Sequence, residues 1–329
     1  MNSTRLGLAL ESGAIELPEH GQIAVVGAVR GDDLSALPKE RVVVVQRHYP
    51  DHRAFQELGF EVATELRGPF TLSIVSLPRA KAEARSVLAS AAKSTNGPVV
   101  VDGQKTDGID SCLKDLRKHS DVGEVISKAH GKLFVINGGD LSDWAASEPP
   151  LVEGKFRTGA GVFSADGVDP ASRQLAEALP ERLKGRVVDL GAGWGYLSDA
   201  VLQREGVVSV DLVEADHKAL EAARSNIQDT RARFHWQDAL TFRPAAAVDH
   251  VVMNPPFHQG RATDSRLGQD FIRAAAAMLE PKGGLWLVAN RHLPYESVLE
   301  DAFHKVQPLD STPSFKLFHA TSPKRRSRG

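Results

Sequence analysis

The feature that most constrains the fold is a strand signal followed directly by three closely spaced glycines and a helix signal. Residues 186–190 form a short apolar run, which predicts a buried strand. Residues 191–195 read Gly-Ala-Gly-Trp-Gly, and a helix is expected over 196–204. Glycines here let the backbone turn tightly and approach a ligand at a helix N-terminus. Because the dinucleotide fingerprint has its third glycine one residue later, the spacing does not match that motif.

Acidic or amide residues stand at or near the ends of four successive predicted strands. They are Asp189, Glu214, Asp238 and Asn254, on strands expected at 186–190, 207–213, 233–236 and 251–253. Ligands of open α/β sheets bind outside the carboxyl ends of the strands, so we expect these side chains at one site. Glu214 is placed to accept hydrogen bonds from both hydroxyls of a ribose. Asp238 is placed to accept from an adenine amino group, with an Asx turn as the alternative.

The fourth strand stops at Asn254-Pro255-Pro256-Phe257-His258, because proline cannot donate to a sheet ladder. The side-chain oxygen of Asn254 and the carbonyl of Pro255 can accept both N–H bonds of a planar NH2 group and so orient its lone pair toward an electrophile. Phe257 can stack on the plane that carries the amine. The tip therefore suits N-alkylation of a planar amine. Taken alone, it is equally well interpreted as a strand-ending turn with Phe257 in the core.

The remaining signals of the second half predict further elements of the same sheet. Helices are expected after the caps Asp169 (with Pro170 at the first position) and Asp216. A helix at 267–279, a turn at 281–284, a strand at 285–289 and a final hairpin near 306 and 315–319 follow. The glycine-rich residues 156–169 either fold over the site, with Phe163 near the substrate, or form a linker with Phe163 in the core.

The first half alternates strand and helix signals but has no comparable site. Strands are expected at 23–26, 41–45, 71–77 and 98–101, and helices at 81–93 and 109–118. The glycines at 27 and 31 have the wrong spacing, and no Asn-Pro-Pro occurs in this half. The breaker cluster at 147–150 marks a boundary. Two domains are therefore predicted, 1–150 without a nucleotide site and 151–329 with one.

Composition excludes several classes of protein. A single cysteine rules out a disulfide framework and fits a reducing, cytoplasmic compartment. No signal peptide or stretch of 18 apolar residues is present, so a membrane protein is not expected. The net charge is −2, and the basic tail 323–328 carries four positive charges, which leaves −6 for the rest. The pair His48 and His52 has helical spacing, but Pro50 and the lack of a third ligand argue against a metal site.

The second half resembles the class I S-adenosylmethionine-dependent methyltransferases, whose turn reads Asp-x-Gly-x-Gly-x-Gly, here from Asp189 to Gly195. Together with residues 254–258, 288–293 and 161–164, it resembles the ribosomal RNA guanine-N2 methyltransferases, and the small-subunit (16S) enzymes most closely. Residues 76–81 and 103–108 are similar to the N-terminal domain of that family. The resemblance implies an α/β fold of two Rossmann-like methyltransferase domains in tandem, the first degenerate and the second a seven-stranded catalytic sheet.

The resemblance also implies site residues and partners. The cofactor is S-adenosylmethionine, and the residues expected to contact it are Asp189, Gly191, Ala192, Gly193, Glu214, Asp238 and Asn254. The residues expected at the substrate amine are Asn254, Pro255, Pro256, Phe257, His258 and Phe163, with Asn254, Pro255 and Phe257 catalytic. No metal is implied. The expected substrate is guanine N2 of 16S rRNA in a ribosomal subunit, the 30S subunit first, and a monomer is expected.

Three alternative enzyme classes share these signals. The large-subunit rRNA enzymes have a similar segment at 291–293, and protein glutamine and DNA adenine methyltransferases use related Asn-Pro-Pro or Asp-Pro-Pro tips. Phe257 and the duplicated architecture favour rRNA over the last two. A non-catalytic RNA-binding assembly module is the alternative outside the enzymes, and the intact glycine turn with Glu214 and Asn254 argues against it.

Overall fold

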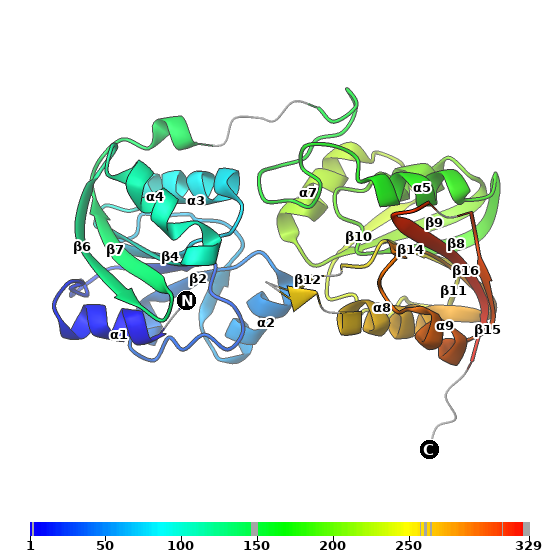
Figure 1. Ribbon diagram of the computed structural model, residues 1–329, viewed down its shortest axis with the longest axis horizontal. Coiled ribbons are helices and arrows are strands. Elements are labelled where there is room, and N and C mark those ends of the chain that lie inside the picture. Colours follow the sequence, from blue (N-terminus) through cyan, green and yellow to red (C-terminus); the bar gives the residue numbers. More distant parts are fainter. Residues whose placement is uncertain are drawn as a thin grey trace, which may run out of the picture. The chain divides into compact units, whose positions relative to one another are not determined.

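The computed structural model describes residues 1, 3–145, 151–256, 258–259, 262–263, 265–310 and 312–324, with the backbone only at 3, 258–259 and 262–263. The chain forms two compact units, Met1–Pro149 and Pro150–Gly329 (Figure 1). The breaker cluster at 147–150 and most of the basic tail lie outside the described residues. Within the described residues, no helix is both long enough and apolar enough to cross a bilayer.

The first unit contains a seven-stranded sheet in the order β3-β2-β1-β4-β5-β7-β6. Its strands are β1 (Ile23–Val26), β2 (Val42–Val45), β3 (Glu61–Ala63), β4 (Leu72–Ser76), β5 (Val99–Gln104), β6 (Asp121–Lys128) and β7 (Gly131–Asn137). Its α-helices are α1 (Ser3–Glu11), α2 (Tyr49–Glu57), α3 (Lys81–Ser94) and α4 (Ile109–Leu116). The strands β3, β2, β1, β4 and β5, which are neighbours in this order, are parallel. Strand β7 pairs antiparallel with both β5 and β6.

The second unit repeats that order as β10-β9-β8-β11-β14-β16-β15. Its strands are β8 (Arg182–Leu190), β9 (Glu205–Glu214), β10 (Ala232–Trp236), β11 (Val248–Met253), β14 (Leu279–Asn290), β15 (Phe303–Pro308) and β16 (Phe315–Pro323). Its helices are α5 (Pro170–Ala178), α6 (Tyr196–Leu202), α7 (His217–Asn226), α8 (Ser265–Met278) and α9 (Glu296–Ala302). A short ribbon, β12 (His258–Gln259) with β13 (Ala262–Thr263), follows the tip of β11.

Both sheets are covered on both faces by helices, as their apolar strands require. In the first unit α3 and α4 lie on one face and α1 and α2 on the other (Figure 1). In the second unit α5, α6 and α7 pack on one face and α8 and α9 on the other. Central strands such as β1, with all four residues buried, read as continuous apolar runs because neither face meets water. The predicted tandem α/β fold and its final antiparallel hairpin are confirmed.

Two parts of the sheets differ from the prediction. The expected turn at 281–284 lies inside strand β14, where the pairing with β11 jumps from Val248–Leu279 to His250–Gly284. The turn prediction is therefore wrong: the extra residues form a bulge, in which a Cβ on Gly283 would come within 2.9 Å of the Leu279 side chain and 3.1 Å of the Asp249 carbonyl. The hairpin β6–β7 was not anticipated, because β6 exposes polar residues and lacks an apolar run.

A histidine ring of the second unit stacks on a tryptophan ring. The His319 ring on β16 lies on the Trp286 ring of β14, with centroids 3.8 Å apart and planes 11° apart. Burial, with smaller contributions from the charges of His250 and Lys305, lowers the pKa of His319 to about 4. The folded state thus favours the neutral ring. Its contribution to stability is complete above the unfolded pKa of about 6.5 and is lost as pH falls toward 4.

We expect His319→Phe, which keeps the stacked ring but cannot titrate, to lose less stability in acid than the wild type. The full shift corresponds to about 3 kcal/mol, and because the ring is only partly buried we expect about 1–2 kcal/mol between pH 7 and pH 4.5. Urea unfolding of both proteins at these two pH values measures the difference. Parallel pH dependences would show that His319 does not titrate in this way.

Candidate functional site

The glycine turn after β8 has the backbone conformation that only glycine adopts easily. Gly191, Gly193 and Gly195 have φ angles of 84°, 55° and 93°. The Gly191 N–H donates to the Val213 carbonyl at the end of β9, 2.9 Å away, which fixes the turn to the neighbouring strand. A Cβ on Gly195 would come within 2.8 Å of Ile227, whereas one on Gly193 would meet no atom within 4 Å. The turn is therefore tight on its helix side and open at Gly193.

Glu214, at the end of β9, is tied to this turn. Its two carboxylate oxygens accept from the backbone N–H of Gly193 and of Asp216, each at 2.8 Å. Burial raises the pKa of Glu214, partly offset by these hydrogen bonds. As predicted, Asp216 caps α7, with its carboxylate accepting from Lys218 N and Ala219 N. The carboxylate of Glu214 thus lies beside the open glycine of the turn.

Asp189 lies beneath the turn rather than at its surface. Its side chain is fully buried, and one oxygen accepts from the Ser198 hydroxyl of α6 at 2.7 Å. The other oxygen is buried without a hydrogen-bond partner in the described part of the chain. Burial raises the pKa of Asp189 to about 7. A polar atom left unsatisfied in this way is costly and is often found where a ligand or water completes the site.

Asn254 follows β11 and is held by the start of α5. Its Nδ2 donates to Asp169 Oδ2 at 2.8 Å and to the Ser172 hydroxyl at 3.0 Å. Pro255 is buried and Pro256 is exposed. Phe257 lies outside the described residues, and for His258 only the backbone is described. The predicted stacking role of these two side chains therefore stays a prediction.

One pocket brings the glycine turn and the tip of β11 together. It is lined by residues from the loop before α5, the start of α5, the glycine turn, α6 and the tip. These are Phe163, Ser164, Asp169, Ser172, Gly191, Ala192, Gly193, Trp194, Tyr196, Leu197 and Asn254. Five predicted site residues thus line the same cavity: Phe163, Gly191, Ala192, Gly193 and Asn254.

The loop before α5 is fastened to the turn by aromatic packing and hydrogen bonds. Phe156 packs against Trp194, with centroids 5.0 Å apart, and Trp194 Nε1 donates to the Phe163 carbonyl at 3.2 Å. The Asn226 side chain of α7 donates to the carbonyls of both Arg157 and Trp194 at 2.9 Å. The Phe163 ring itself is 59% exposed and is not in the core. Of the two predicted interpretations of this loop, folding over the site agrees with the structure.

Asp238 does not line this pocket. Its Oδ1 accepts from the backbone N–H of Leu240 at 2.9 Å, which closes an Asx turn after β10. This was the alternative to an adenine contact. The hydrogen bond occupies one oxygen of the carboxylate, and the adenine contact stays a prediction.

Asp169, Ser172 and Trp194 line the pocket but were not predicted as site residues. The sequence predicts Asp169 as a helix cap, and this is confirmed, because its carboxylate accepts from Ser172 N at 2.8 Å. The local signal for the cap carries no information on its contact with Asn254, which lies 85 residues away in the sequence.

The first unit has the same backbone arrangement with different side chains. Gly27 N donates to Val45 O, as Gly191 N does to Val213 O. This shared hydrogen bond places Gln46 of the first unit at the position equivalent to Glu214 of the second. The strand pairings place Val25 at the position equivalent to Asp189. They place Ser76 at the position equivalent to Asn254. Gln46 accepts from His48 N but donates its own N–H to the Ala28 carbonyl at 2.6 Å. An amide that donates into the turn cannot present the two acceptors that Glu214 presents.

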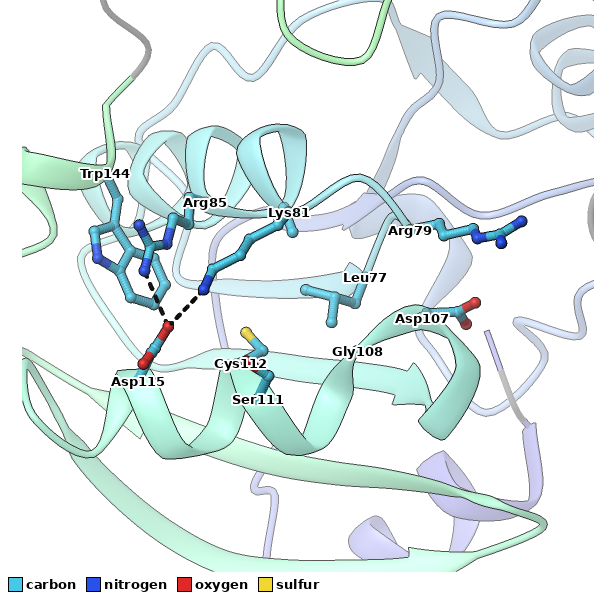
Figure 2. Close-up of a pocket in the computed structure, with 11 residues that line it drawn as sticks. Leu77, Arg79, Lys81, Arg85, Asp107, Gly108, Ser111, Cys112, Asp115 and Trp144 are labelled. Atoms are coloured by element: carbon cyan, nitrogen blue, oxygen red, sulfur yellow. Dashed lines mark hydrogen bonds and ion pairs between the residues drawn. The ribbon is translucent and has the colours of Figure 1, made fainter.

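One cavity of the first unit, at the carboxyl ends of β4 and β5, is crossed by ion pairs (Figure 2). Asp115 on α4 accepts from Arg85 at 2.9 Å and pairs with Lys81 at 3.3 Å, and Arg85 stacks over Trp144. These hydrogen bonds, with a third from Lys118, lower the pKa of Asp115 to about 2. Lys81 and Arg85 are thus paired with Asp115, and the network joins α3, α4 and Trp144.

The two histidines with helical spacing have separate roles. His48 precedes α2 and pairs with Asp51 at 2.7 Å, whereas His52 is buried and contacts the Gln46 carbonyl at 2.9 Å. Among the described residues, no group of three or more His, Cys, Asp and Glu side chains is arranged to hold a metal ion.

Comparison with known proteins agrees with this geometry. Residues 153–319 match the family model of the methyltransferase small domain. A ribosomal RNA small subunit methyltransferase C of Psychromonas ingrahamii is 31% identical over 75% of each chain. One from Alteromonas mediterranea is 27% identical over 93% of this chain and 96% of its own.

Among solved structures, the T. thermophilus 16S rRNA N2 G1207 methyltransferase in complex with AdoMet and guanosine has a TM-score of 0.76. It is 25% identical and covers 93% of this chain and 90% of its own. The family match spans the glycine turn, the strand-end acids and the tip of β11, the features on which the resemblance was predicted. The chain belongs to the ribosomal RNA small subunit methyltransferase C family.

Proposed function

We propose that the second unit transfers a methyl group from S-adenosylmethionine to the exocyclic N2 amine of a guanine in 16S rRNA. The observation that carries this proposal is that the glycine turn and Asn254 line the same pocket. A methyl donor held by the turn and an amine held by the tip would then meet in one cavity. The names of the relatives, and the AdoMet and guanosine bound to the T. thermophilus neighbour, support the same chemistry.

The residues present fit the cofactor. Gly193 leaves open space where any side chain would project, and the Glu214 carboxylate lies next to it for a ribose. The unsatisfied oxygen of Asp189 beneath the turn is a further acceptor. We propose that Asp189, Gly191, Ala192, Gly193, Glu214 and Asp238 hold S-adenosylmethionine. When bound, this cofactor supplies an electrophilic methyl group on a sulfonium.

The tip of β11 would hold the amine. We propose that Asn254 Oδ1 and the Pro255 carbonyl accept its two N–H bonds, which turns the nitrogen lone pair away from the tip. Much of the rate should then come from alignment and from stabilising the positive charge that develops on nitrogen. No strong general base is needed, because the alkylated amine is acidic and loses its proton to water. Phe257, Pro256, His258 and Phe163 are proposed to contact the base.

The finer properties of the enzyme belong to the same proposal. We propose that the enzyme acts on the 30S subunit, as a monomer, without a metal and in the cytoplasm. We also propose that the first unit serves in substrate recognition or in the structure. Large-subunit rRNA, protein glutamine and DNA adenine are the competing substrates. Incubation with radiolabelled S-adenosylmethionine and unmodified 30S particles, 50S particles or free 16S rRNA separates them. Label in N2-methylguanosine of 16S rRNA supports the proposal, and label only in another acceptor overturns it.

We expect Glu214→Gln to bind S-adenosylmethionine about 10- to 100-fold more weakly, since hydrogen bonds to a charged group contribute about 1.5–3 kcal/mol. Both carboxylate oxygens accept from backbone N–H groups, and an amide can satisfy only one of them. In the first unit Gln46 already occupies the position equivalent to Glu214, and its amide nitrogen donates to the Ala28 carbonyl of the turn. Isothermal titration measures the affinity.

The matched control for this variant is Glu280→Gln. This acid lies in the same unit on β14, partly exposed and paired with Arg186, and it does not contact the turn. It should bind the cofactor like the wild type. Equal affinities for all three proteins would show that Glu214 does not hold the cofactor.

A further inference from the structure

Asn254 has an amide side chain, so its chemistry depends on which end faces the substrate. The oxygen accepts hydrogen bonds and the nitrogen donates them. A target amine brings N–H donors to the tip, so only the oxygen can bind it. If the amide were reversed, two donors would face each other and the hydrogen bond would be lost.

The start of α5 determines this orientation. The Asp169 carboxylate, which when ionised only accepts, lies 2.8 Å from one end of the Asn254 amide, and this end must be the nitrogen. The Ser172 hydroxyl lies 3.0 Å from the same nitrogen. Because Asp169 and Ser172 both bind the nitrogen, the Asn254 oxygen at the other end of the amide is available to accept a hydrogen bond from a substrate. All three residues line the pocket that contains the glycine turn.

Asp169 is itself held in place by the fold. Its Oδ2, the atom that meets Asn254, also accepts from Ser172 N at 2.8 Å as the N-cap of α5. Pro170 occupies the first turn of the helix, and Leu175 anchors it in the core with no exposed surface. The orientation of the Asn254 amide is thus fixed by the cap of a helix that packs against the central sheet.

We propose that Asp169 and Ser172 are positioning residues that hold the Asn254 amide with its oxygen toward the target amine. The inference rests on the proposed function. It assigns to the cap of α5 a role in the methyl transfer step, separate from its role in helix stability.

The test is a double-mutant cycle with Asp169→Asn and Asn254→Ala. Asparagine at 169 keeps the size of the side chain but offers a donor as well as an acceptor, so either orientation of the Asn254 amide can be satisfied. We expect kcat for rRNA methylation to fall about 10- to 100-fold, as for other small misplacements of reacting groups, with S-adenosylmethionine affinity unchanged. In the Asn254→Ala background, Asp169→Asn should cause no further loss, because its effect acts through Asn254.

Two further variants separate positioning from stability. Ser172→Ala removes the weaker acceptor and should lower kcat by a smaller factor than Asp169→Asn. If Asp169→Asn does not fold, Ser172→Ala by itself tests the inference. Val298→Ala truncates a buried residue of α9 in the same unit and should lower the melting temperature without lowering kcat. An equal fall in kcat for Asp169→Asn in both backgrounds, or wild-type kcat for both Asp169→Asn and Ser172→Ala, would overturn the inference. Failure of the proposed function looks different: the wild-type protein itself then leaves 16S rRNA unmethylated.

Discussion

Asn254→Ala is expected to methylate 16S rRNA about 10²–10³-fold more slowly than the wild type, the loss found when one preorganised group that stabilises transition-state charge is removed. The Asn254 amide lies in the pocket of the glycine turn with its nitrogen held by Asp169 and Ser172. Alanine removes the acceptor for the target amine and leaves Glu214 and the glycines in place.

Single-turnover kinetics with 30S particles measure the rate, and titration with S-adenosylmethionine measures binding. We expect binding within a few-fold of the wild type, because Asn254 contributes mainly to the amine side of the pocket. The matched control is Gln228→Ala, which removes another side-chain amide of the same unit, one that donates to the Arg224 carbonyl and does not line the pocket, and it should methylate rRNA like the wild type. Equal losses of turnover and cofactor binding in Asn254→Ala would indicate that Asn254 supports the structure instead.

Arg5→Met is expected to destabilise the first unit by about 3–5 kcal/mol, the cost of leaving one partner of a buried ion pair alone. Arg5 on α1 is 1% exposed, and its Nε donates to Asp102 Oδ1 of β5 at 2.5 Å. Its guanidinium also donates to the Lys128 carbonyl at the end of β6. The residue thus connects the first helix to a central strand and to the edge hairpin, and the variant leaves the Asp102 carboxylate in the core.

Hydrogen exchange followed by mass spectrometry measures this effect, because it follows peptides of 1–145 separately from those of 151–324. Peptides of β5 and β7 should exchange faster in Arg5→Met, while those of β8 and β11 stay protected. The double variant Arg5→Met with Asp102→Leu should recover most of the protection, since apolar replacements of a whole buried pair are often neutral. Unchanged exchange in Arg5→Met would show that the pair contributes little.

Much of the fold follows from the sequence because the central strands are short apolar runs buried on both faces. Strand β1 has the predicted bounds, and β2 and β4 differ by a residue or two. The prediction fails where tertiary contacts override local signals. Gly283 and Pro281 read as a turn, but pairing with β11 holds them in a bulged strand. Strand β6 gives no apolar signal, because it is an edge strand whose side chains mostly face water.

The candidate site was partly predictable for a related reason. Residues at strand ends are brought together by the parallel sheet itself, so Gly193 and Asn254 could be assigned to one cavity from their strands alone. Contacts made by the first residues of a helix cannot be predicted in this way. Nothing local to Asp169 indicates that its cap also binds an amide on β11, and Gln46 takes the position of Glu214 in a way that only the strand register reveals.

The most direct test of the account is a crystal structure of the protein with S-adenosylhomocysteine and guanosine. We predict that the cofactor product lies along the Gly191–Gly193 turn with its ribose at Glu214, and that the guanine N2 amine lies within hydrogen-bonding distance of Asn254 Oδ1. Binding of the two ligands on different faces of the unit, or guanosine turned with N2 away from Asn254, would contradict it.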